Sequence, residues 1–458
     1  MAETRNFSKL HIAMFPWFAF GHMNPFLHLA NELAKRGHQI SFLLPKKALL
    51  QLESANLYPD LITFHVVAVP PVDGLPPGTE TASEIHLSAT AHLATAMDLT
   101  RDQVEQLLTQ LKPNFVFFDF ACWVPELAPK IGFKSVVYSV VSAASIAIAL
   151  VPARNVPEDR PVTEADLAEP PPGYPSSTVV LRRHEARALT FISKDFGSGR
   201  TFYGRTATAM KECDAISFRT CREMEGQFCD YIGTQYNKPV ILTGPVLPAL
   251  GKSPLEGQWA EWLAGFRPGS VVFCAFGSQW ILEKRQFQEM VLGFELTGYP
   301  FLVAVKPPAG EATVEEALPE GFEERVKSRG LVHGGWVPQP ELLSHGSVGC
   351  FVTHCGFGSM WESLMSDKQI VLVPQLGDQI LNSRILTEEL NVAVEVERDE
   401  DGWFSKESLS KAVKSVMEED GEVGSLVRRK HARWRETLAI HGFMDGYVDR
   451  FLEELHEL

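Results

Sequence analysis

The sequence predicts an α/β protein with two doubly wound parallel-sheet domains that face a cleft. Two observations lead to this fold class. From Leu10 onward, short continuous runs of Val, Ile, Phe and Leu alternate with longer amphipathic stretches. Such uninterrupted apolar runs are typical of parallel strands that helices cover on both faces. The same alternation starts again after residue 257, behind a stretch rich in Pro and Gly, so we expect one sheet in each half of the chain.

The first series begins with a strand and a helix. Residues 10–16 are predicted to be a buried strand and residues 24–36 the helix that follows, with Gly37 where a helix stop is expected. The other elements expected in this half are strands at 39–45, 62–67, 114–119 and 135–139, and a long helical pattern over 85–111.

The second series has the same character. Its expected strands are 270–276, 300–306, 348–354 and 369–375, and its expected helices are 283–298, 358–366 and 380–390. A surface excursion is predicted at 152–177, where Pro and acidic residues are frequent. The predicted domains are an acceptor-binding domain at 1–243, a linker at 244–257, a donor-binding domain at 258–440 and a helix at 441–458 that packs back on the first domain.

Composition narrows the possible functions. The chain has 458 residues, and 42 Lys and Arg against 57 Asp and Glu give a formal net charge of −15. Because nucleic acids and anionic membranes require a basic face, neither is expected as the main partner. The most hydrophobic run, 136–151, is shorter than the about 20 residues of a membrane-spanning helix. An odd number of cysteines without a C-x-x-C pair, and a start without an apolar leader, favour a cytoplasmic protein with reduced thiols.

We expect no metal site. Asp399, Glu400 and Asp401 match a metal-binding D-x-D by their letters, but they lie in a polar stretch that is more typical of a solvated turn. The sequence has neither an H-E-x-x-H motif nor a cluster of Cys and His with metal-ligand spacing.

A strand-to-helix turn within 336–379 carries chemistry suited to phosphate. The predicted strand ends at His354, and a helix is expected to begin near Gly358 and Ser359, with Gly356 between them. Glycines in such a turn let backbone N–H groups approach a diphosphate closely, and the helix dipole favours its negative charge. The side chains of His354 and Ser359 can add further donors.

Residues suited to the rest of a nucleotide sugar surround this turn. Gly277 and Ser278 form a second turn with further hydrogen-bond donors, and Trp336 offers an aromatic face for a base. Glu362 offers a carboxylate for ribose hydroxyls, and Asp378 and Gln379 are polar groups for sugar hydroxyls.

The stretch 336–379 resembles the signature box of plant secondary-product UDP-glycosyltransferases, members of glycosyltransferase family one, and the likeness covers nearly the whole chain. It implies a GT-B fold of two Rossmann-like domains and a UDP-sugar donor substrate without a further cofactor. By position, it assigns base stacking to Trp336, base pairing to the Val337 backbone, a place near the ribose to Gln339, ribose binding to Glu362, phosphate binding to His354 and Ser359, and sugar binding to Asp378 and Gln379.

The box departs from the common HCGWNS form at two places. The usual Trp is Phe357 and the usual Asn is Gly358, so one side-chain donor to the phosphates is lost while the backbone N–H groups remain. This variant resembles the branch-forming subgroup, whose members add a sugar to a sugar already present on a flavonoid or another small-molecule glycoside. We therefore expect a glycoside acceptor and a UDP-sugar donor, with the donor sugar left open.

Sugar transfer requires the acceptor hydroxyl to lose its proton, and a neutral histidine suits that role. His22 follows the first predicted strand, and Asp119 ends an apolar strand at the carboxyl edge of the same expected sheet. Pairing of the two is the simplest geometry, and the resemblance assigns them the catalytic base and its orienting carboxylate. Direct displacement of UDP then implies inversion at the anomeric carbon.

The acceptor side is less legible. The resemblance expects a hydroxyl that touches the donor sugar, and Ser139 and Ser142 are both candidates. Phe18, Phe20, Trp123 and the loops 69–84 and 181–203 could contact the acceptor, with core packing the equal alternative.

Four alternatives to the branch-forming reaction remain. They are transfer to an aglycone hydroxyl of a flavonoid-like phenolic, a UDP-sugar epimerase or hydrolase, a non-catalytic sensor, and a NAD-dependent oxidoreductase. The last needs a G-x-G-x-x-G after the first strand, where Gly21 stands alone. We expect a monomer.

Overall fold

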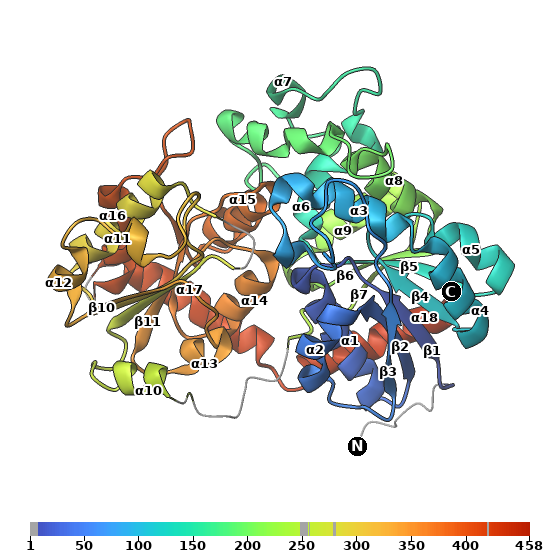
Figure 1. Cartoon of the computed structure of the whole chain (residues 1–458), viewed down its shortest axis with the longest axis horizontal. Coiled ribbons are helices and arrows are strands. Elements are labelled where there is room, and N and C mark those ends of the chain that lie inside the picture. Colours follow the sequence, from blue (N-terminus) through green and yellow to red (C-terminus); the bar gives the residue numbers. More distant parts are fainter. Residues whose placement is uncertain (1–7, 248–254, 256, 278–280, 419–420) are drawn as a thin grey trace. The chain divides into compact units, whose positions relative to one another are not determined.

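The computed structural model describes residues 8–247, 255, 257–277, 281–418 and 421–458 (Figure 1). The chain forms two compact units. Unit 1 comprises Met1–Pro175, Thr190–Val246 and Met444–Leu458, and unit 2 comprises Ser176–Leu189 and Leu247–Phe443. The chain therefore passes from one unit to the other four times.

Unit 1 is built on a seven-stranded, entirely parallel sheet with the order β3-β2-β1-β4-β5-β6-β7. Ile12 and Met14 of β1 belong to a core cluster on one face of the sheet, and the alternate residues Ala13 and Phe15 are also fully buried. Burial of both faces explains the continuous apolar runs of the sequence. The strands are β1 (His11–Phe15), β2 (Gln39–Pro45), β3 (Ile62–Val67), β4 (Phe115–Phe118), β5 (Lys134–Ser139), β6 (Ala215–Phe218) and β7 (Val240–Leu242).

Helices α1, α2 and α18 pack on the cluster that contains Ile12 and Met14. The helices of unit 1 are α1 (Phe20–Lys35), α2 (Lys46–Leu52), α3 (Thr90–Asp98), α4 (Arg101–Leu111), α5 (Val124–Ile131), α6 (Ala143–Ala149), α7 (Glu164–Leu167), α8 (Phe202–Glu212), α9 (Arg222–Tyr236) and α18 (Phe443–Glu457).

Two helices of unit 1 differ from the prediction. Helix α1 begins at Phe20, four residues earlier than expected, because the Ala19 carbonyl accepts the amides of both His22 and Met23 at 2.9 Å. The predicted helix 85–111 is two helices, α3 and α4, separated at Leu99 and Thr100. The Thr100 hydroxyl donates to the Met97 carbonyl at 2.6 Å, so it satisfies a backbone acceptor at the end of α3.

Unit 2 contains a six-stranded parallel sheet with the order β10-β9-β8-β11-β12-β13. Along β8, Val272 and Cys274 pack with α11 and α16 on one face, whereas Val271 and Phe273 pack with α10 and α13 on the other. The strands are β8 (Val271–Ala275), β9 (Phe301–Ala304), β10 (Gly330–His333), β11 (Val348–Thr353), β12 (Gln369–Leu372) and β13 (Val394–Glu395).

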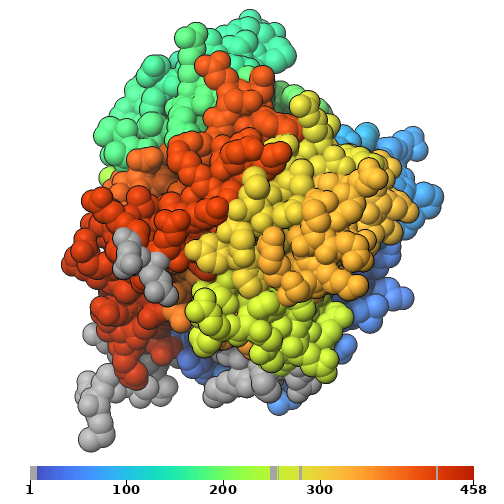
Figure 2. Space-filling view, turned by 90° about the vertical axis from the view of Figure 1, so that its left-hand side faces the viewer, coloured from blue at the N-terminus to red at the C-terminus, as the bar shows by residue number. Residues whose placement is uncertain are grey.

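The helices of unit 2 are α10 (Gln258–Leu263), α11 (Lys284–Thr297), α12 (Phe322–Val326), α13 (Gln339–Ser344), α14 (Phe357–Met365), α15 (Gly377–Arg384), α16 (Lys406–Met417) and α17 (Glu422–Leu438). Figure 2 shows a face of unit 2 on which α11, in yellow, adjoins α16, in orange-red. The predicted helix 380–390 starts earlier, at Gly377, and continues as a π-helix over Ile385–Glu389.

The segment Ser176–Leu189 lies in unit 2, although the predicted boundaries put it with the first half of the chain. Glu185 forms an ion pair with Arg384, whose side chain is only 4% exposed. Leu189 packs so closely on Gly377 that a Cβ atom there would stand 2.3 Å from Leu189 Cδ2. These contacts tie the segment to the first and last residues of α15.

Among the described residues, no helix has the length and apolarity needed to cross a membrane. All seven cysteines are free and buried. Burial raises the pKa of Cys350 and of Cys274, both on the central strands of unit 2, so these thiols stay protonated.

Candidate active site

His22 and Asp119 lie at the carboxyl ends of two neighbouring strands. Strands β1 and β4 pair with Phe15 opposite Phe118, Asp119 directly follows β4, and His22 lies in the first turn of α1. From β1 the chain continues to β2 on one side, whereas β4 lies on the other side, and such a switch point is where doubly wound sheets bind ligands. This topology brings the two predicted residues together, with His22 Nδ1 2.6 Å from Asp119 Oδ2.

The carboxylate of Asp119 is held on both oxygens. Its Oδ1 accepts the backbone amides of Trp17 and Phe120, each at 2.7 Å, while Oδ2 faces the imidazole. Because a carboxylate only accepts, His22 Nδ1 carries the ring proton and Nε2 is left with its lone pair. The His22 side chain is 20% exposed and that of Asp119 is 8% exposed, so the ring is oriented but still accessible.

Four aromatic side chains, which we call the aromatic wall, lie beside His22: Trp17, Phe120, Phe196 and Phe202. The Phe120 ring is 5.6 Å from the imidazole and 5.3–5.4 Å from each of the other three rings. Trp17 is buried, whereas the three phenylalanines are only half-buried. They therefore present apolar ring surface next to the imidazole.

In unit 2, His354 lies between two glycines at the corresponding strand ends. It follows β11, and Gly277 follows the paired strand β8. A Cβ atom at Gly277 would stand 3.0 Å from the ring, and one at Gly356 would stand 2.6 Å from Nε2. Gly277 also has φ of +69°, which side-chain-bearing residues rarely adopt. The two glycines let backbone approach the imidazole closely.

Burial lowers the pKa of His354 to about 4, so the ring is neutral at pH 7. Its Nδ1 is buried and has no hydrogen-bond partner among the described residues. A buried polar nitrogen without a partner is costly unless a ligand satisfies it. The neutral ring, next to the N-terminus of α14, is suited to binding a phosphate oxygen through a single N–H.

Gln339, Ser359 and Glu362 form one polar cluster beside this turn. The side-chain nitrogen of Gln339, in the first turn of α13, donates to the Glu362 carboxylate and, at 3.4 Å, to the Ser359 hydroxyl. Ser359 and Glu362 are one turn apart on α14. The predicted ribose and phosphate ligands are therefore close to one another.

Trp336 is 83% exposed, the highest exposure of any large hydrophobic residue in the described part of the chain. The next residue, Val337, is 8% exposed and its carbonyl accepts the Gln339 amide at 2.9 Å. An indole that packs on so little of the protein is available to stack on a planar base.

The two departures from the common box differ in their surroundings. Phe357 is 4% exposed, and its ring packs edge-on against Trp361 at 6.1 Å. Its side chain belongs to the core, so only its backbone can reach a donor. At Gly358 an added Cβ atom would meet nothing within 4 Å, so the missing side chain leaves open space at the first turn of α14.

Asp378 and Gln379 lie in the first turn of α15, after β12. Asp378 is half-buried. Gln379 is 7% exposed, and its side-chain oxygen accepts the amides of Gln375 at 3.0 Å and Leu376 at 3.1 Å. The amide group of Gln379 is thereby fixed in orientation by the turn that begins the helix.

The serines predicted near the donor sugar are engaged inside unit 1. Ser142 is completely buried and caps α6, with its hydroxyl 2.6 Å from that of Ser145. Ser139 is 6% exposed and its hydroxyl donates to the Val141 carbonyl at 3.3 Å. Helix capping accounts for Ser142 without any ligand. Ser278 lies outside the described residues.

The acidic stretch after β13 is a turn. The Asp399 carboxylate accepts the amides of Asp401 at 3.0 Å and Trp403 at 2.8 Å, which explains these acidic letters. In the part of the chain that the structure describes, no group of three or more His, Cys, Asp and Glu could hold a metal ion.

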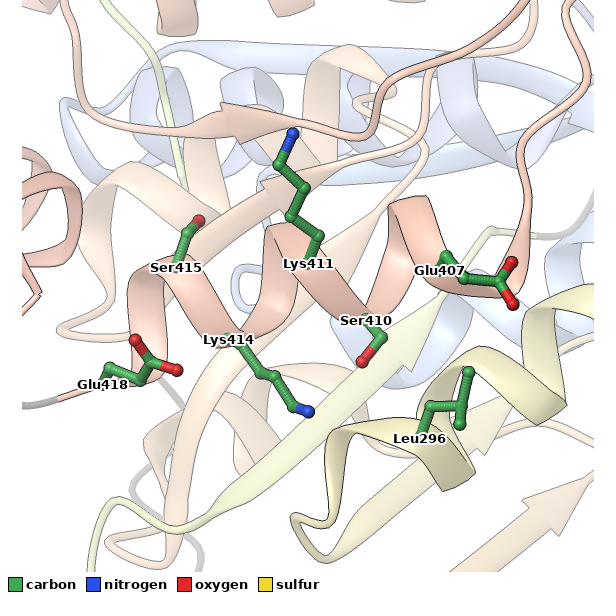
Figure 3. A pocket seen from close by; sticks show the side chains of 7 residues that line it. All are labelled: Leu296, Glu407, Ser410, Lys411, Lys414, Ser415 and Glu418. Carbon is green, nitrogen blue, oxygen red and sulfur yellow. The ribbon is translucent and has the colours of Figure 1, made fainter.

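A depression on the surface of unit 2 lies away from these residues. It is formed by α16 and the adjoining end of α11, and Figure 3 shows Lys411 and Lys414 pointing away from the helix axis. Lys411 is paired with Glu397 at 2.9 Å. None of the predicted site residues lines this depression, so it does not contribute to the candidate site.

No phenylalanine of the aromatic wall was named individually from the sequence, although Phe196 and Phe202 lie in the loop 181–203 that was expected near the acceptor. Phe120 follows Asp119 directly, and this neighbour of a strand-ending acid is the only sequence feature that points to it. Phe196 and Phe202 lie in a loop and at a helix start, where aromatic residues are as often core as ligand-binding, so contacts in space were needed to group them.

A family model described as UDP-glucoronosyl and UDP-glucosyl transferase matches residues 326–443. The chain is 60% identical to anthocyanidin 3-O-glucoside 2'''-O-xylosyltransferase of Arabidopsis thaliana, over 98% of this chain and 97% of that protein. It is 58% identical to UDP-glycosyltransferase 79B6 of Arabidopsis thaliana, over 98% of both chains.

Solved structures with similar folds cover nearly the whole chain. The crystal structure of Glycyrrhiza uralensis UGT73P12, complexed with glycyrrhetinic acid 3-O-monoglucuronide, matches 98% of this chain and 96% of that one, with a TM-score of 0.81 at 20% sequence identity. This likeness confirms the GT-B fold that the sequence predicted.

Proposed function

Because the chain belongs to the family of plant UDP-glycosyltransferases, we propose that it transfers a sugar from a UDP-sugar to a sugar hydroxyl of a small-molecule glycoside, with inversion at the anomeric carbon. Family membership supplies the enzyme class and the UDP-sugar donor. The proposal adds the residues that do the chemistry, the acceptor class and the stereochemistry.

His22 acts as the general base. The observation that carries this role is the 2.6 Å contact of its Nδ1 with Asp119, which leaves Nε2 ready to accept a proton. The acceptor O–H gives its proton to Nε2, and its oxygen forms the new bond to the anomeric carbon. The bond from that carbon to the diphosphate oxygen breaks, and UDP leaves with the electron pair. Attack from the face opposite the leaving group inverts the configuration.

Unit 2 holds the donor. Trp336 stacks on uracil, whose edge pairs with the Val337 backbone, and the Gln339–Glu362 pair receives the ribose hydroxyls. His354, Ser359 and the backbone at Phe357 and Gly358 stabilise the charge that develops on the departing diphosphate. The transferred sugar is bound by Asp378 and Gln379, and Ser278 adds a hydrogen-bond donor to the diphosphate.

The glycoside acceptor is supported by two observations. The relative that is 60% identical is named as a xylosyltransferase of an anthocyanidin 3-O-glucoside. The Phe357 and Gly358 departures also match the resemblance to branch-forming enzymes. We further propose that the enzyme works as a cytoplasmic monomer, with an acceptor-binding unit 1 and a donor-binding unit 2.

The test is a panel of UDP-glucose, UDP-rhamnose, UDP-xylose and UDP-galactose against flavonoid glucosides and their aglycones, with products read by mass spectrometry. The expected result is transfer to the glucosides, with NMR of the products showing an inverted anomeric configuration. Rapid reaction of free flavonols together with failure of every glucoside would instead establish the aglycone alternative. Release of free sugar without any acceptor product would indicate a hydrolase.

A further inference from the structure

A buried ion pair outside the predicted site lies against the backbone of the aromatic wall. Arg205, on α8, has a completely buried side chain, and Asp98 is the last residue of α3. Two parallel hydrogen bonds join them, from Nη1 to Oδ1 at 2.8 Å and from Nη2 to Oδ2 at 2.6 Å. This bidentate geometry fixes the plane of the guanidinium.

The remaining three N–H groups of Arg205 all donate to backbone carbonyls. They reach Phe120 at 3.1 Å, Phe196 at 3.2 Å and Gly197 at 3.2 Å. All five donors of the guanidinium are therefore used. Since Phe120 and Phe196 are both members of the aromatic wall, a single side chain holds the backbone of two of its rings.

Asp98 also binds the loop 196–200, which carries Phe196. Its carboxylate also accepts the Ser198 hydroxyl at 2.7 Å and the Trp123 indole N–H at 3.1 Å. Burial disfavours the ionised form of Asp98, but the hydrogen bonds and the charge of Arg205 outweigh this effect and lower the pKa of Asp98. The pair is thus ionised across the physiological pH range.

The loop that carries Phe196 is further clamped on α3. Gly197 has φ of +94°, and a Cβ atom there would stand 2.7 Å from the Thr95 nitrogen, so its backbone lies directly on the helix. The Ser198 amide donates to the Thr95 hydroxyl at 3.1 Å, and the Phe196 amide donates to the Arg200 carbonyl at 2.7 Å. The loop is fixed from three sides, although it lies beside an accessible imidazole.

We propose that Arg205 and Asp98 are positioning residues that set the affinity of the enzyme for its acceptor by fixing Phe120 and Phe196 beside His22. The proposal rests on the proposed function. The acceptor presents either the C–H face of a sugar or a planar phenolic ring to this wall, and both stack on phenyl rings. Phe120 extends the effect to the base, because its amide donates to the Asp119 carboxylate at 2.7 Å.

The test compares two variants of the ion pair with a matched control. The double variant Arg205→Met/Asp98→Leu removes both charges together, which avoids leaving one of them buried alone, and Arg205→Lys keeps the charge but loses the fork. The control is Arg154→Met, another arginine of unit 1 that donates only to carbonyls, those of Ile148, Asp166 and Glu169.

Three readouts are measured on each folded variant: the KM for the glycoside acceptor, the Kd for UDP, and the hydrogen exchange of the amides in 196–200. Both Arg205 variants are expected to raise the acceptor KM by roughly tenfold, leave the UDP Kd unchanged and speed exchange in 196–200, while Arg154→Met changes none of these.

A wild-type acceptor KM in the double variant would overturn the proposal, as would an equal rise of KM in Arg154→Met. If the wild-type enzyme transfers no sugar to any glycoside, the proposed function fails by itself. The hydrogen exchange of 196–200 still decides whether Arg205 anchors the loop, because it can be measured on an inactive protein. Exchange at the wild-type rate in the double variant would refute the anchoring.

Discussion

The imidazole of His354 lies so close to Gly356 that a Cβ atom on this glycine would stand 2.6 Å from Nε2. Both residues are in the turn between β11 and α14, and the ring is buried. A side chain at position 356 would therefore have to displace the His354 imidazole. Two residues later, at Gly358, the space is open.

This contrast predicts effects of different size for two alanine substitutions in one turn. Gly356→Ala should weaken UDP binding by about tenfold or more, because the new methyl group must displace His354. Gly358→Ala should weaken UDP binding less, since its Cβ meets no protein atom within 4 Å and its backbone N–H remains. Isothermal titration with UDP measures both. Equal affinity of the two variants would contradict the assignment of His354 to the phosphates.

Loss of the His22 imidazole should strongly reduce turnover but leave UDP binding unchanged. His22→Ala is expected to lower kcat by about 10²–10⁴, the usual contribution of a general base, with the Kd for UDP unchanged because the nucleotide is assigned to unit 2. Asp119→Asn should also lower kcat, since an amide at this position can donate as well as accept and no longer keeps the ring proton of His22 on Nδ1. The surface variant His441→Ala serves as control, and wild-type turnover in His22→Ala would refute the base assignment.

The exposed Trp336 indole should contribute to UDP binding and not to the stability of the fold. Trp336→Ala is expected to cost about 1–3 kcal/mol of UDP binding free energy, the range for stacking of a base on an aromatic ring, with an unchanged melting temperature. Leu99, which is 60% exposed in unit 1, gives the matched control Leu99→Ala, with neither property altered. A UDP Kd insensitive to Trp336→Ala would show that uracil binds elsewhere.

A buried carboxyl in unit 1 predicts a pH dependence of stability. Glu225, on α9, is completely buried, its Oε1 accepts the Ala144 amide at 3.1 Å, and burial raises its pKa to about 7. The raised pKa means that the folded state holds this proton more tightly than the unfolded chain does. The stability that it contributes is full below about pH 4.3, the unfolded value, and is lost as the pH rises through about 7.

Between about pH 4.3 and a pH above 7 the loss amounts to about 4 kcal/mol. Glu225→Gln keeps the acceptor for Ala144 but has no proton to lose, so its free energy of unfolding should fall less between pH 6 and pH 8 than that of the wild type. Denaturant unfolding at the two pH values measures this, with the exposed Glu212→Gln as control. An identical pH dependence in Glu225→Gln and the wild type would mean that Glu225 does not titrate in this range.

The sheets and the pairing of His22 with Asp119 could be predicted because they depend on local pattern and simple topology. Buried parallel strands are apolar throughout, and polar residues that follow adjacent strands meet at one edge of the sheet. The start of α1 could not be located, because Asn24 and Pro25 together imitate a helix beginning. The true start depends on the Ala19 carbonyl, which has no side-chain signature.

Other features depend on contacts between residues far apart in sequence. Nothing near Arg205 indicates that Asp98, more than a hundred residues earlier, is its partner, and the predicted continuous helix 85–111 conceals the break that ends α3 at Asp98. Ser142, like Ser139, was a candidate for the donor sugar because the family resemblance expects a hydroxyl in this region. A serine at that place can equally cap the next helix, and only the structure shows that it does.

Unit 1 contains both the beginning of the chain and α18, which follows all of unit 2. The Phe451 ring of α18 packs on Phe117 at 5.9 Å. Asp445 and Asp449 of α18 pair with Lys35 and Arg36 at the end of α1, the helix whose first turn contains His22. During synthesis, then, the half made first is completed last. A chain truncated before α18 would leave part of the apolar cluster of unit 1 uncovered and the end of α1 without these ion pairs, so we expect unit 1 to be unstable until α18 has been made.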